Sequence, residues 1–195
     1  MLVLASASPR RLSLLRQIGL EPDAVDPADT DETPGLREVP RAYALRMAEA
    51  KLAAVMPRHP EAVVLAGDSV VAVGRRILPK AETEAQARTC LALLSGRRHK
   101  VLGGVAVGRA GKTRTRLVET AVRFKRLAPS EIDDYVRSGE WQGKAGGYAI
   151  QGRAAAFVAF LSGSYSNVVG LPLYESIALL GGEKFPIRAG WLNAG

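Results

Sequence analysis

The hydrophobic residues near the start of the chain repeat at the spacing of an amphipathic helix. Leu12, Leu15 and Ile18 fall at three-residue intervals, so they lie on one face of a helix. Ser8 is the expected N-cap of this helix, and Gly19 stands where a left-handed residue ends it. The pattern therefore predicts an early helix that packs one apolar face against a core.

Other stretches are continuously apolar or rich in β-branched residues, which is typical of strands. The runs 99–108 and 113–124 are separated by turn residues and predict a β-hairpin. Strands and helices mix along the chain, and the hairpin makes the sheet mixed, so we expect an α/β fold. Further helices are predicted over residues 40–57, 83–96, 129–139 and 171–180, and further strands over residues 3–5, 62–66, 70–73 and 156–161.

Length and composition indicate an ordinary globular protein. The 195 residues, of which 47% are hydrophobic, suit one domain spanning residues 1–195. No apolar run is long enough for a transmembrane helix, so we expect no membrane partner. The lone Cys90 excludes a disulfide framework and fits a reducing cytoplasm. These features predict a soluble cytoplasmic domain.

The charge balance is strongly basic, with 27 Lys and Arg residues against 19 Asp and Glu residues, a formal net charge of +8. The basic residues are dispersed and aromatic residues make up only 6% of the chain, which argues against a nucleic-acid partner. A solvated basic surface is one interpretation. The other is an anionic small molecule in a cleft, which such a surplus favours.

The segment between the first strand and the first helix is a candidate anion site. Ser6 and Ser8 precede Arg10 and Arg11 at a helix N-terminus, where free backbone N–H groups attract anions. The two guanidinium groups add donors that suit phosphate oxygens. The alternative is that one arginine reaches into solvent while the other pairs with a surface carboxylate.

Two acidic positions are candidates for catalysis or metal binding. Asp68 follows the apolar run 63–66 and so stands where a buried strand is expected to meet a cleft. Its alternative is a turn residue that caps the backbone. Glu32 lies in an acidic loop with Asp29 and Asp31, which would hold a divalent cation through oxygen ligands or would simply be solvated.

Three further polar residues have a functional and a structural interpretation. Lys51 lies on an otherwise apolar helix and Lys80 follows a second hairpin, expected around the turn at residues 74–76, so each is either a site residue or surface charge. Gln151 is suited to reading a nucleobase edge or to satisfying buried backbone groups. His99 has no second metal ligand at a suitable spacing.

Taken together, these segments resemble the Maf family of nucleoside triphosphate pyrophosphatases over nearly the whole chain. The matching blocks follow the family's order. They are residues 4–11, 31–32, 46–48 with Lys51, 67–71, 78–80, 94–96 with His99 and Val101, 144–152 and 163–172.

The resemblance implies a fold and a reaction. The expected fold is a central mixed sheet flanked by helices, with two lobes around a cleft, shared with the inosine triphosphate pyrophosphatases. The expected reaction converts a nucleoside triphosphate and water to a monophosphate and pyrophosphate, with Mg²⁺ or Mn²⁺. Asp68 resembles the family's general base, and Glu32 would act with Asp68 at the metal. Arg10, Arg11, Lys51 and Lys80 would hold the phosphates, with Ser6 and Ser8 lining the pocket.

Within the family the chain resembles the branch that acts on dTTP and UTP. Arg10-Arg11, Ser69 and Gln151 match that branch's substrate-binding positions. Two rival hypotheses stay open: the same reaction on 7-methyl-GTP or inosine nucleotides, and a regulator of septum formation that acts by binding a partner. The sequence also leaves a homodimer open.

The chain departs from the usual family pattern at a few positions. Ala50 replaces a glutamate, Ser69 a threonine and Ala81 a proline. Gly103 and Gly104 stand where a threonine is common, which would remove a hydroxyl near the sheet edge. We expect these changes to leave catalysis intact. The preference for one nucleobase over another is more sensitive to them.

Overall fold

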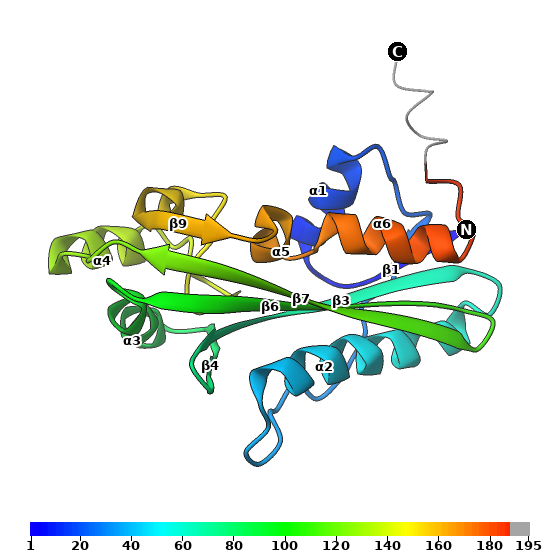
Figure 1. Cartoon of the computed structure of the whole chain (residues 1–195), viewed down its shortest axis with the longest axis horizontal. Coiled ribbons are helices and arrows are strands. Elements are labelled where there is room, and N and C mark those ends of the chain that lie inside the picture. Colours follow the sequence, from blue (N-terminus) through cyan, green and yellow to red (C-terminus); the bar gives the residue numbers. More distant parts are fainter. Residues whose placement is uncertain (188–195) are drawn as a thin grey trace.

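The computed structural model describes residues 1–187 and is built on one seven-stranded mixed sheet (Figure 1). Its strand order is β2-β1-β3-β6-β7-β9, with β4 paired to β3. β1 pairs in parallel with β2 and β3, whereas the other pairs are antiparallel. The predicted mixed sheet is therefore confirmed. The strands are β1 (Leu2–Ala5), β2 (Ala24–Val25), β3 (Val63–Val73), β4 (Arg76–Leu78), β6 (Arg98–Arg109), β7 (Lys112–Phe124) and β9 (Val158–Ser162).

Helices cover both faces of this sheet. Figure 1 shows α2 on one face and α1, α5 and α6 on the other. α2 buries Ala44, Met47, Ala48 and Val55 against the sheet, which is the apolar stripe that the helical spacing of these residues predicts. The helices are α1 (Pro9–Gln17), α2 (Pro40–Val55), α3 (Glu84–Leu94), α4 (Pro129–Arg137), α5 (Tyr165–Val169) and α6 (Leu173–Gly182), with short 3₁₀ turns at η1 (Met56–Arg58) and η2 (Arg153–Phe157).

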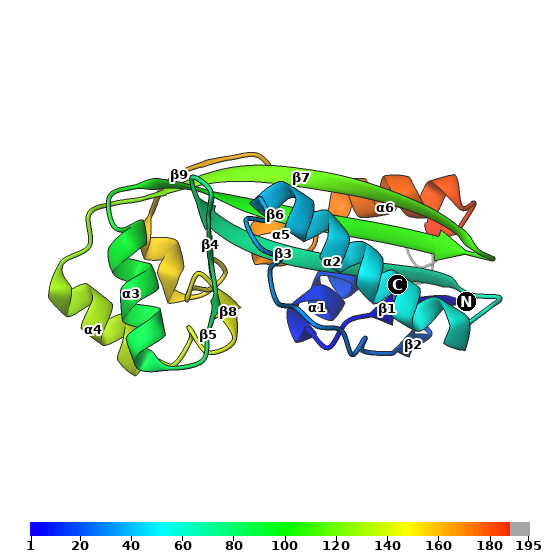
Figure 2. The same ribbon diagram turned by 90° about the horizontal axis from the view of Figure 1, so that it is seen from below.

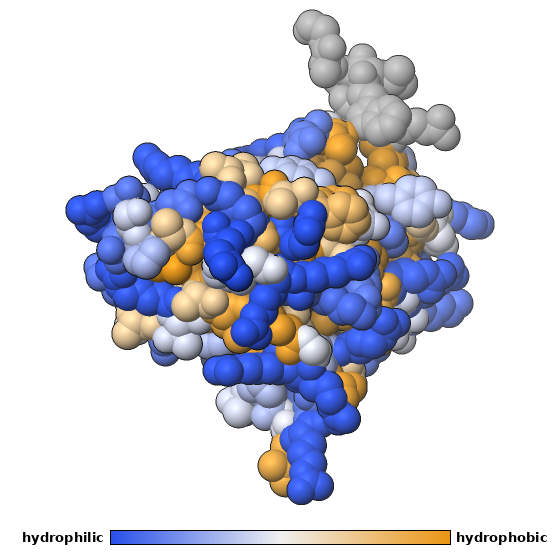
Figure 3. All heavy atoms as spheres, turned by 60° about the vertical axis from the view of Figure 1, so that its left-hand side comes forward, coloured by the Kyte–Doolittle hydropathy of each residue, from blue (hydrophilic) through white to orange (hydrophobic). Residues whose placement is uncertain are grey.

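A smaller lobe lies beyond one end of the long strands. Figure 2 shows α3, α4 and a two-stranded ribbon grouped there, apart from α1, α2 and β1. The ribbon consists of β5 (Lys80–Ala81) and β8 (Lys144–Ala145), paired antiparallel. The two-lobed arrangement that the resemblance implies is therefore present. Figure 3 shows this end of the molecule covered mostly by hydrophilic side chains, with apolar residues in small separate patches.

Local sequence signals explain some helix ends and not others. α3 begins with a capping box, in which the Gln86 backbone N–H donates to Thr83 Oγ1 (3.3 Å) and Gln86 Oε1 accepts from the Thr83 N–H (3.2 Å). Ser8 occupies the N-cap position of α1, but its side chain makes no capping bond, contrary to the prediction. The last helix was expected over 171–180 and instead begins at Leu173, after Pro172.

β3 differs from the prediction in a way that matters for the site. The sequence predicts two strands separated at Gly67, Asp68 and Ser69, but β3 continues through them as one eleven-residue strand. The reason is the partner: β6 pairs with every residue of this stretch, and Asp68 stands opposite Gly104. Asp68 thus lies within a central strand and not at a strand end.

Two glycines of β6 allow α2 and α5 to approach the sheet. A side chain at Gly104 would place its Cβ 2.0 Å from the Ala44 carbonyl oxygen of α2, and one at Gly103 would lie 1.8 Å from Asn167 Oδ1. The sequence led us to expect these glycines near the edge of the sheet. Because β6 lies between β3 and β7, they lie inside the sheet instead.

Among residues 1–187, no helix has the length and apolar character needed to cross a membrane.

A buried aromatic cluster joins the small lobe to the sheet. His99 is 1% exposed, packs edge-on against Phe124 and Tyr148, and its Nε2 lies 2.9 Å from the Tyr148 hydroxyl. Burial lowers the pKa of His99 from 6.5 to about 4, because the charged imidazolium is poorly solvated there. The native state therefore requires a neutral His99.

This requirement predicts a pH-dependent loss of stability. Because the pKa is lowered in the folded state, the contribution of neutral His99 is fully present above pH 6.5 and is lost as the pH falls towards 4. Between neutral pH and pH 4.5, the free energy of unfolding of the wild type should fall by about 1–3 kcal/mol more than that of His99→Gln. Urea titrations of both proteins would measure this, and parallel pH profiles would contradict it.

Candidate active site

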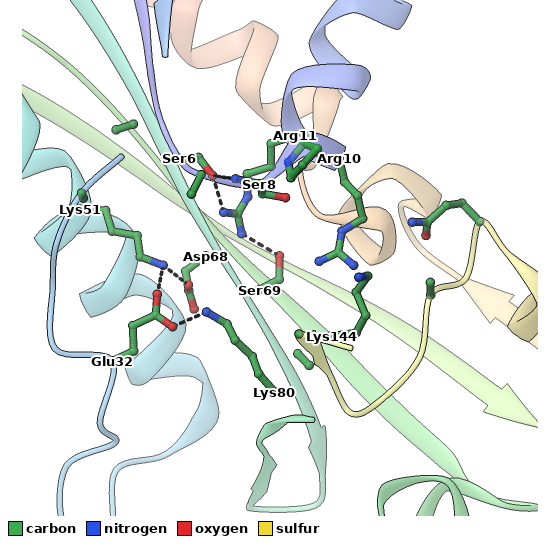
Figure 4. A pocket seen from close by; sticks show the side chains of 18 of the residues that line it. Ser6, Ser8, Arg10, Arg11, Glu32, Lys51, Asp68, Ser69, Lys80 and Lys144 are labelled. Carbon is green, nitrogen blue, oxygen red and sulfur yellow. Dashed lines mark hydrogen bonds and ion pairs between the residues drawn. The ribbon is translucent and has the colours of Figure 1, made fainter. Parts of the chain in front are cut away.

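One cavity of about 680 Å³ lies between the sheet and the small lobe, and Figure 4 shows it from close by. It is lined from one side by β1, α1 and β3 and from the other by the ribbon and the segment after β8. The structure thus brings together every predicted site residue, from segments far apart in the sequence. These residues are Ser6, Ser8, Arg10, Arg11, Glu32, Lys51, Asp68, Ser69, Lys80 and Gln151.

A buried lysine joins the two acidic candidates. Lys51 Nζ of α2 lies 2.7 Å from Asp68 Oδ1 of β3 and 2.7 Å from Glu32 Oε1. Lys80 of β5 forms a second ion pair with Glu32 from the opposite side. Lys51 is 7% exposed and Asp68 5% exposed, so Lys51 is a buried residue of the cavity and not surface charge.

The lysines set the charge of Glu32. Burial raises the pKa of Glu32, but the hydrogen bonds and positive charges of Lys51 and Lys80 outweigh it and lower the pKa to about 2. Glu32 is therefore ionised at neutral pH. The Tyr43 hydroxyl donates to the Glu32 backbone carbonyl (2.6 Å), which fixes the loop that carries this carboxylate.

Arg11 is held by neutral groups. Its Nε donates to the Gly170 carbonyl (2.9 Å) and its Nη1 to Ser6 Oγ (2.9 Å). A longer bond of 3.4 Å joins Nη2 to Ser69 Oγ, and the Ser69 hydroxyl donates to the same Gly170 carbonyl (3.2 Å). Burial lowers the pKa of Arg11, against the charges of Asp68 and Glu32. Arg11 is buried and does not extend into solvent, and within residues 1–187 its hydrogen bonds go to no surface carboxylate.

Other parts of the acidic loop do not reach the cavity. Asp29 and Asp31 are exposed and do not line it, and Asp31 Oδ1 accepts from the Thr33 N–H (2.8 Å) within the loop. Two charged residues that the sequence patterns did not single out, Glu140 and Lys144, do line it. Lys144 belongs to the Gly-rich segment of the family resemblance, and that placement was the available signal.

The donor set fits a divalent cation only in part. Glu32 and Asp68 supply hard carboxylate oxygens, and they converge on Lys51. Within residues 1–187, no group of three or more His, Cys, Asp or Glu side chains is placed to hold a metal. Mg²⁺ commonly takes one or two carboxylates and completes its coordination with water and substrate phosphates. The residues therefore fit a cation that shares its ligands with a substrate.

The buried ion pairs predict unequal effects of two lysine substitutions. Lys51→Met leaves the buried Asp68 carboxylate without its counter-ion, so the free energy of unfolding should fall by about 3–5 kcal/mol. Lys80→Met removes the same charge from a side chain that is 48% exposed and should cost about 1 kcal/mol or less. Urea unfolding at neutral pH without nucleotide would compare them, and equal losses would contradict the prediction.

The chain is similar to known proteins along almost its whole length. A family described as Maf-like protein matches residues 1–183. A relative from Nitrobacter hamburgensis named dTTP/UTP pyrophosphatase is 61% identical over 201 aligned positions, covering 100% of this chain and 97% of the relative. One from Rhodospirillum rubrum with the same name is 65% identical over 185 positions, covering 94% of this chain and 88% of the relative.

A solved structure is also similar, though distantly. It is a nucleoside-triphosphatase / dITP/XTP pyrophosphatase from Mycobacterium abscessus, 17% identical, with a TM-score of 0.37. The match covers 71% of this chain and 94% of that one. Likeness at this level carries no argument about the reaction.

Proposed function

The chain belongs to the Maf-like protein family, and on this premise we propose that it is a nucleoside triphosphate pyrophosphatase acting on dTTP and UTP. The observation that carries the proposal is identity of 61% over the whole chain with a relative of that name. The reaction releases the nucleoside monophosphate and pyrophosphate.

The charge of the cavity supports a polyphosphate substrate. Five cationic side chains line it against three carboxylates, so it carries a positive surplus. Arg11 is the more deeply buried of the two arginines that line the cavity, and its direct partners are hydroxyl and carbonyl oxygens that do not neutralise it. A buried cation without a directly bonded carboxylate favours an anionic ligand close to it.

We assign Asp68 the role of general base. Its carboxylate takes a proton from the water whose oxygen attacks the α-phosphorus. As that P–O bond forms, the bond from the α-phosphorus to the bridging oxygen breaks, and its electron pair leaves with pyrophosphate. The position of Asp68 inside β3 and its contact with Lys51 support this role, because both hold the carboxylate in a fixed orientation.

The remaining site residues bind the substrate. We assign the phosphates to Arg10, Arg11, Lys51 and Lys80, and Ser6 and Ser8 line the same cavity. Cations that are already positioned stabilise the charge that develops on the phosphate oxygens without reorganising. Ser69 and Gln151 line the cavity as well, and we assign them to substrate selection.

We propose that the reaction uses a divalent cation, Mg²⁺ or Mn²⁺, which Glu32 and Asp68 hold together with the substrate. When bound, such a cation neutralises phosphate charge. Glu32 supports this assignment because its low pKa keeps it ionised over the whole physiological range.

A substrate panel tests the proposal. Purified protein with Mg²⁺ or Mn²⁺ should release pyrophosphate from dTTP and UTP faster than from CTP, 7-methyl-GTP, ITP or GTP. Faster release of pyrophosphate from 7-methyl-GTP or from ITP would show that this nucleotide is the preferred substrate instead. No release from any nucleotide would favour the regulator of septum formation.

Substitution of the proposed base should separate chemistry from binding. Asp68→Asn should lower kcat for dTTP by about 10²–10⁴-fold, because it removes the proton acceptor, while the Kd for dTTP changes little. Asp29→Asn, in the same loop as Glu32 but outside the cavity, is the matched control and should keep wild-type turnover. Steady-state kinetics and calorimetry would measure both, and substantial turnover by Asp68→Asn would exclude the base role.

A further inference from the structure

The loop before α2 carries Glu32 but has little structure of its own. Residues 27–39 form no helix or strand, and Figure 1 shows this segment extending away from the sheet. Leu36, near the tip of the loop, is 98% exposed, so the tip gains no stability from burial. The position of the Glu32 backbone therefore depends on the contacts that other elements make with the loop.

Arg46 of α2 bonds to this loop at two places. Its Nε and Nη2 donate to the two carboxylate oxygens of Glu38, each at 2.7 Å, and Nη2 also donates to the Thr33 carbonyl (3.2 Å). Glu38 Oε2 in turn accepts from the Gly35 N–H (2.8 Å). The planar fork of a guanidinium suits this set of oxygens, whereas a lysine ammonium presents a single point charge. Arg46 thus ties the part of the loop after Glu32 to α2.

Tyr43, one turn earlier on α2, holds Glu32 itself. Its hydroxyl donates to the Glu32 carbonyl (2.6 Å), and the guanidinium carbon of Arg46 lies 5.3 Å from the centroid of its ring. A cation at this distance is attracted to the face of an aromatic ring, so the two side chains support each other. Together they bind two consecutive carbonyls of the loop, those of Glu32 and Thr33.

These main-chain contacts matter most when a substrate is bound. Without one, Lys51 and Lys80 pair with the Glu32 carboxylate, as Figure 4 shows. Under the proposed function both lysines also bind phosphates, whose negative charge competes with Glu32 for them. Tyr43 and Arg46 do not line the cavity of about 680 Å³, so the phosphates do not compete for their bonds to the loop.

We propose that Arg46 is a positioning residue, which keeps the Glu32 backbone in place while substrate phosphates draw Lys51 and Lys80 away from its carboxylate. The inference rests on the proposed function and deepens it. The alternative is an ordinary surface ion pair with Glu38, and such pairs contribute little. That alternative does not account for the bond from Arg46 to the Thr33 carbonyl, directly after Glu32.

Hydrogen exchange in the full chain tests this role without turnover. The amides of Thr33 and Gly35 are followed with and without a saturating α,β-methylene analogue of dTTP, whose carbon bridge cannot be hydrolysed. In the wild type the analogue should change their exchange rates by less than about 2-fold, whereas in Arg46→Met it should raise them about 10-fold, the scale of one lost hydrogen bond. Arg41→Met is the matched control, because Arg41 is an exposed cation of α2 that pairs with Glu119 outside the loop. It should behave as the wild type.

Turnover of dTTP gives a second measurement. Arg46→Met should lower kcat by about 10- to 100-fold, the usual cost of removing the support of a ligand-binding side chain, and change KM less. Arg46→Lys keeps the charge but not the fork, so it should recover part of kcat. In a Glu32→Gln background, Arg46→Met should lower the remaining kcat by less than about 2-fold, because the carboxylate that it positions is absent.

Three outcomes would overturn the positioning role. They are loop exchange in Arg46→Met that the analogue leaves unchanged, an equal loss of kcat from Arg46→Met with and without the Glu32 carboxylate, and a wild type that does not bind the analogue. The turnover of dTTP by the wild type is scored separately. Turnover together with any of these outcomes rejects the positioning role and keeps the proposed function. Absence of turnover rejects the function, while hydrogen exchange still decides whether Arg46 holds the loop.

Discussion

The structure depends on one buried charge, the ammonium of Lys51. It is removed from water at the contact between α2 and β3, and this is tolerable only because Asp68 and Glu32 both reach it at 2.7 Å. That requirement fixes three segments relative to one another: the helix, the central strand and the loop that carries Glu32. It also explains why α2 lies so close to the sheet, where Gly104 of β6 leaves room for the Ala44 carbonyl. Packing and charge therefore specify the same geometry.

Much of this arrangement could be predicted from sequence, for physical reasons that differ between elements. The long hairpin of β6 and β7 and the capped helix α3 carry their own signals, since periodicity and a capping box are local properties. The two-residue strands β2, β5 and β8 are too short to show any period, and their pairing comes from the tertiary fold. That these ten residues line one cavity could be anticipated because the family resemblance preserves their order along the chain.

What escaped prediction was decided by partners distant in sequence. Asp68 was expected at a strand end because its own segment has the composition of a turn. In the structure, β6 pairs with β3 on both sides of Asp68, so the strand continues through it. The burial of Arg11 depends on Gly170, 159 residues away, which no local pattern reveals. Lys144 carries no signal of its own within its glycine-rich segment, and it reaches the cavity because β8 pairs with β5. In each case, the local sequence does not reveal which distant segment the residue contacts.

The anchor of Arg11 has an evolutionary consequence. The Gly170 carbonyl that receives both the guanidinium and the Ser69 hydroxyl is a main-chain atom, so no side-chain replacement deletes it. Gly170 itself has a φ of +150°, a conformation that other residues adopt only with strain. Mutation can therefore alter Ser69 or Gln151 and leave the main hold on the arginine in place. Under the proposed function, mutation could therefore change the preferred nucleobase while the anchor of the phosphate-binding arginine stays in place.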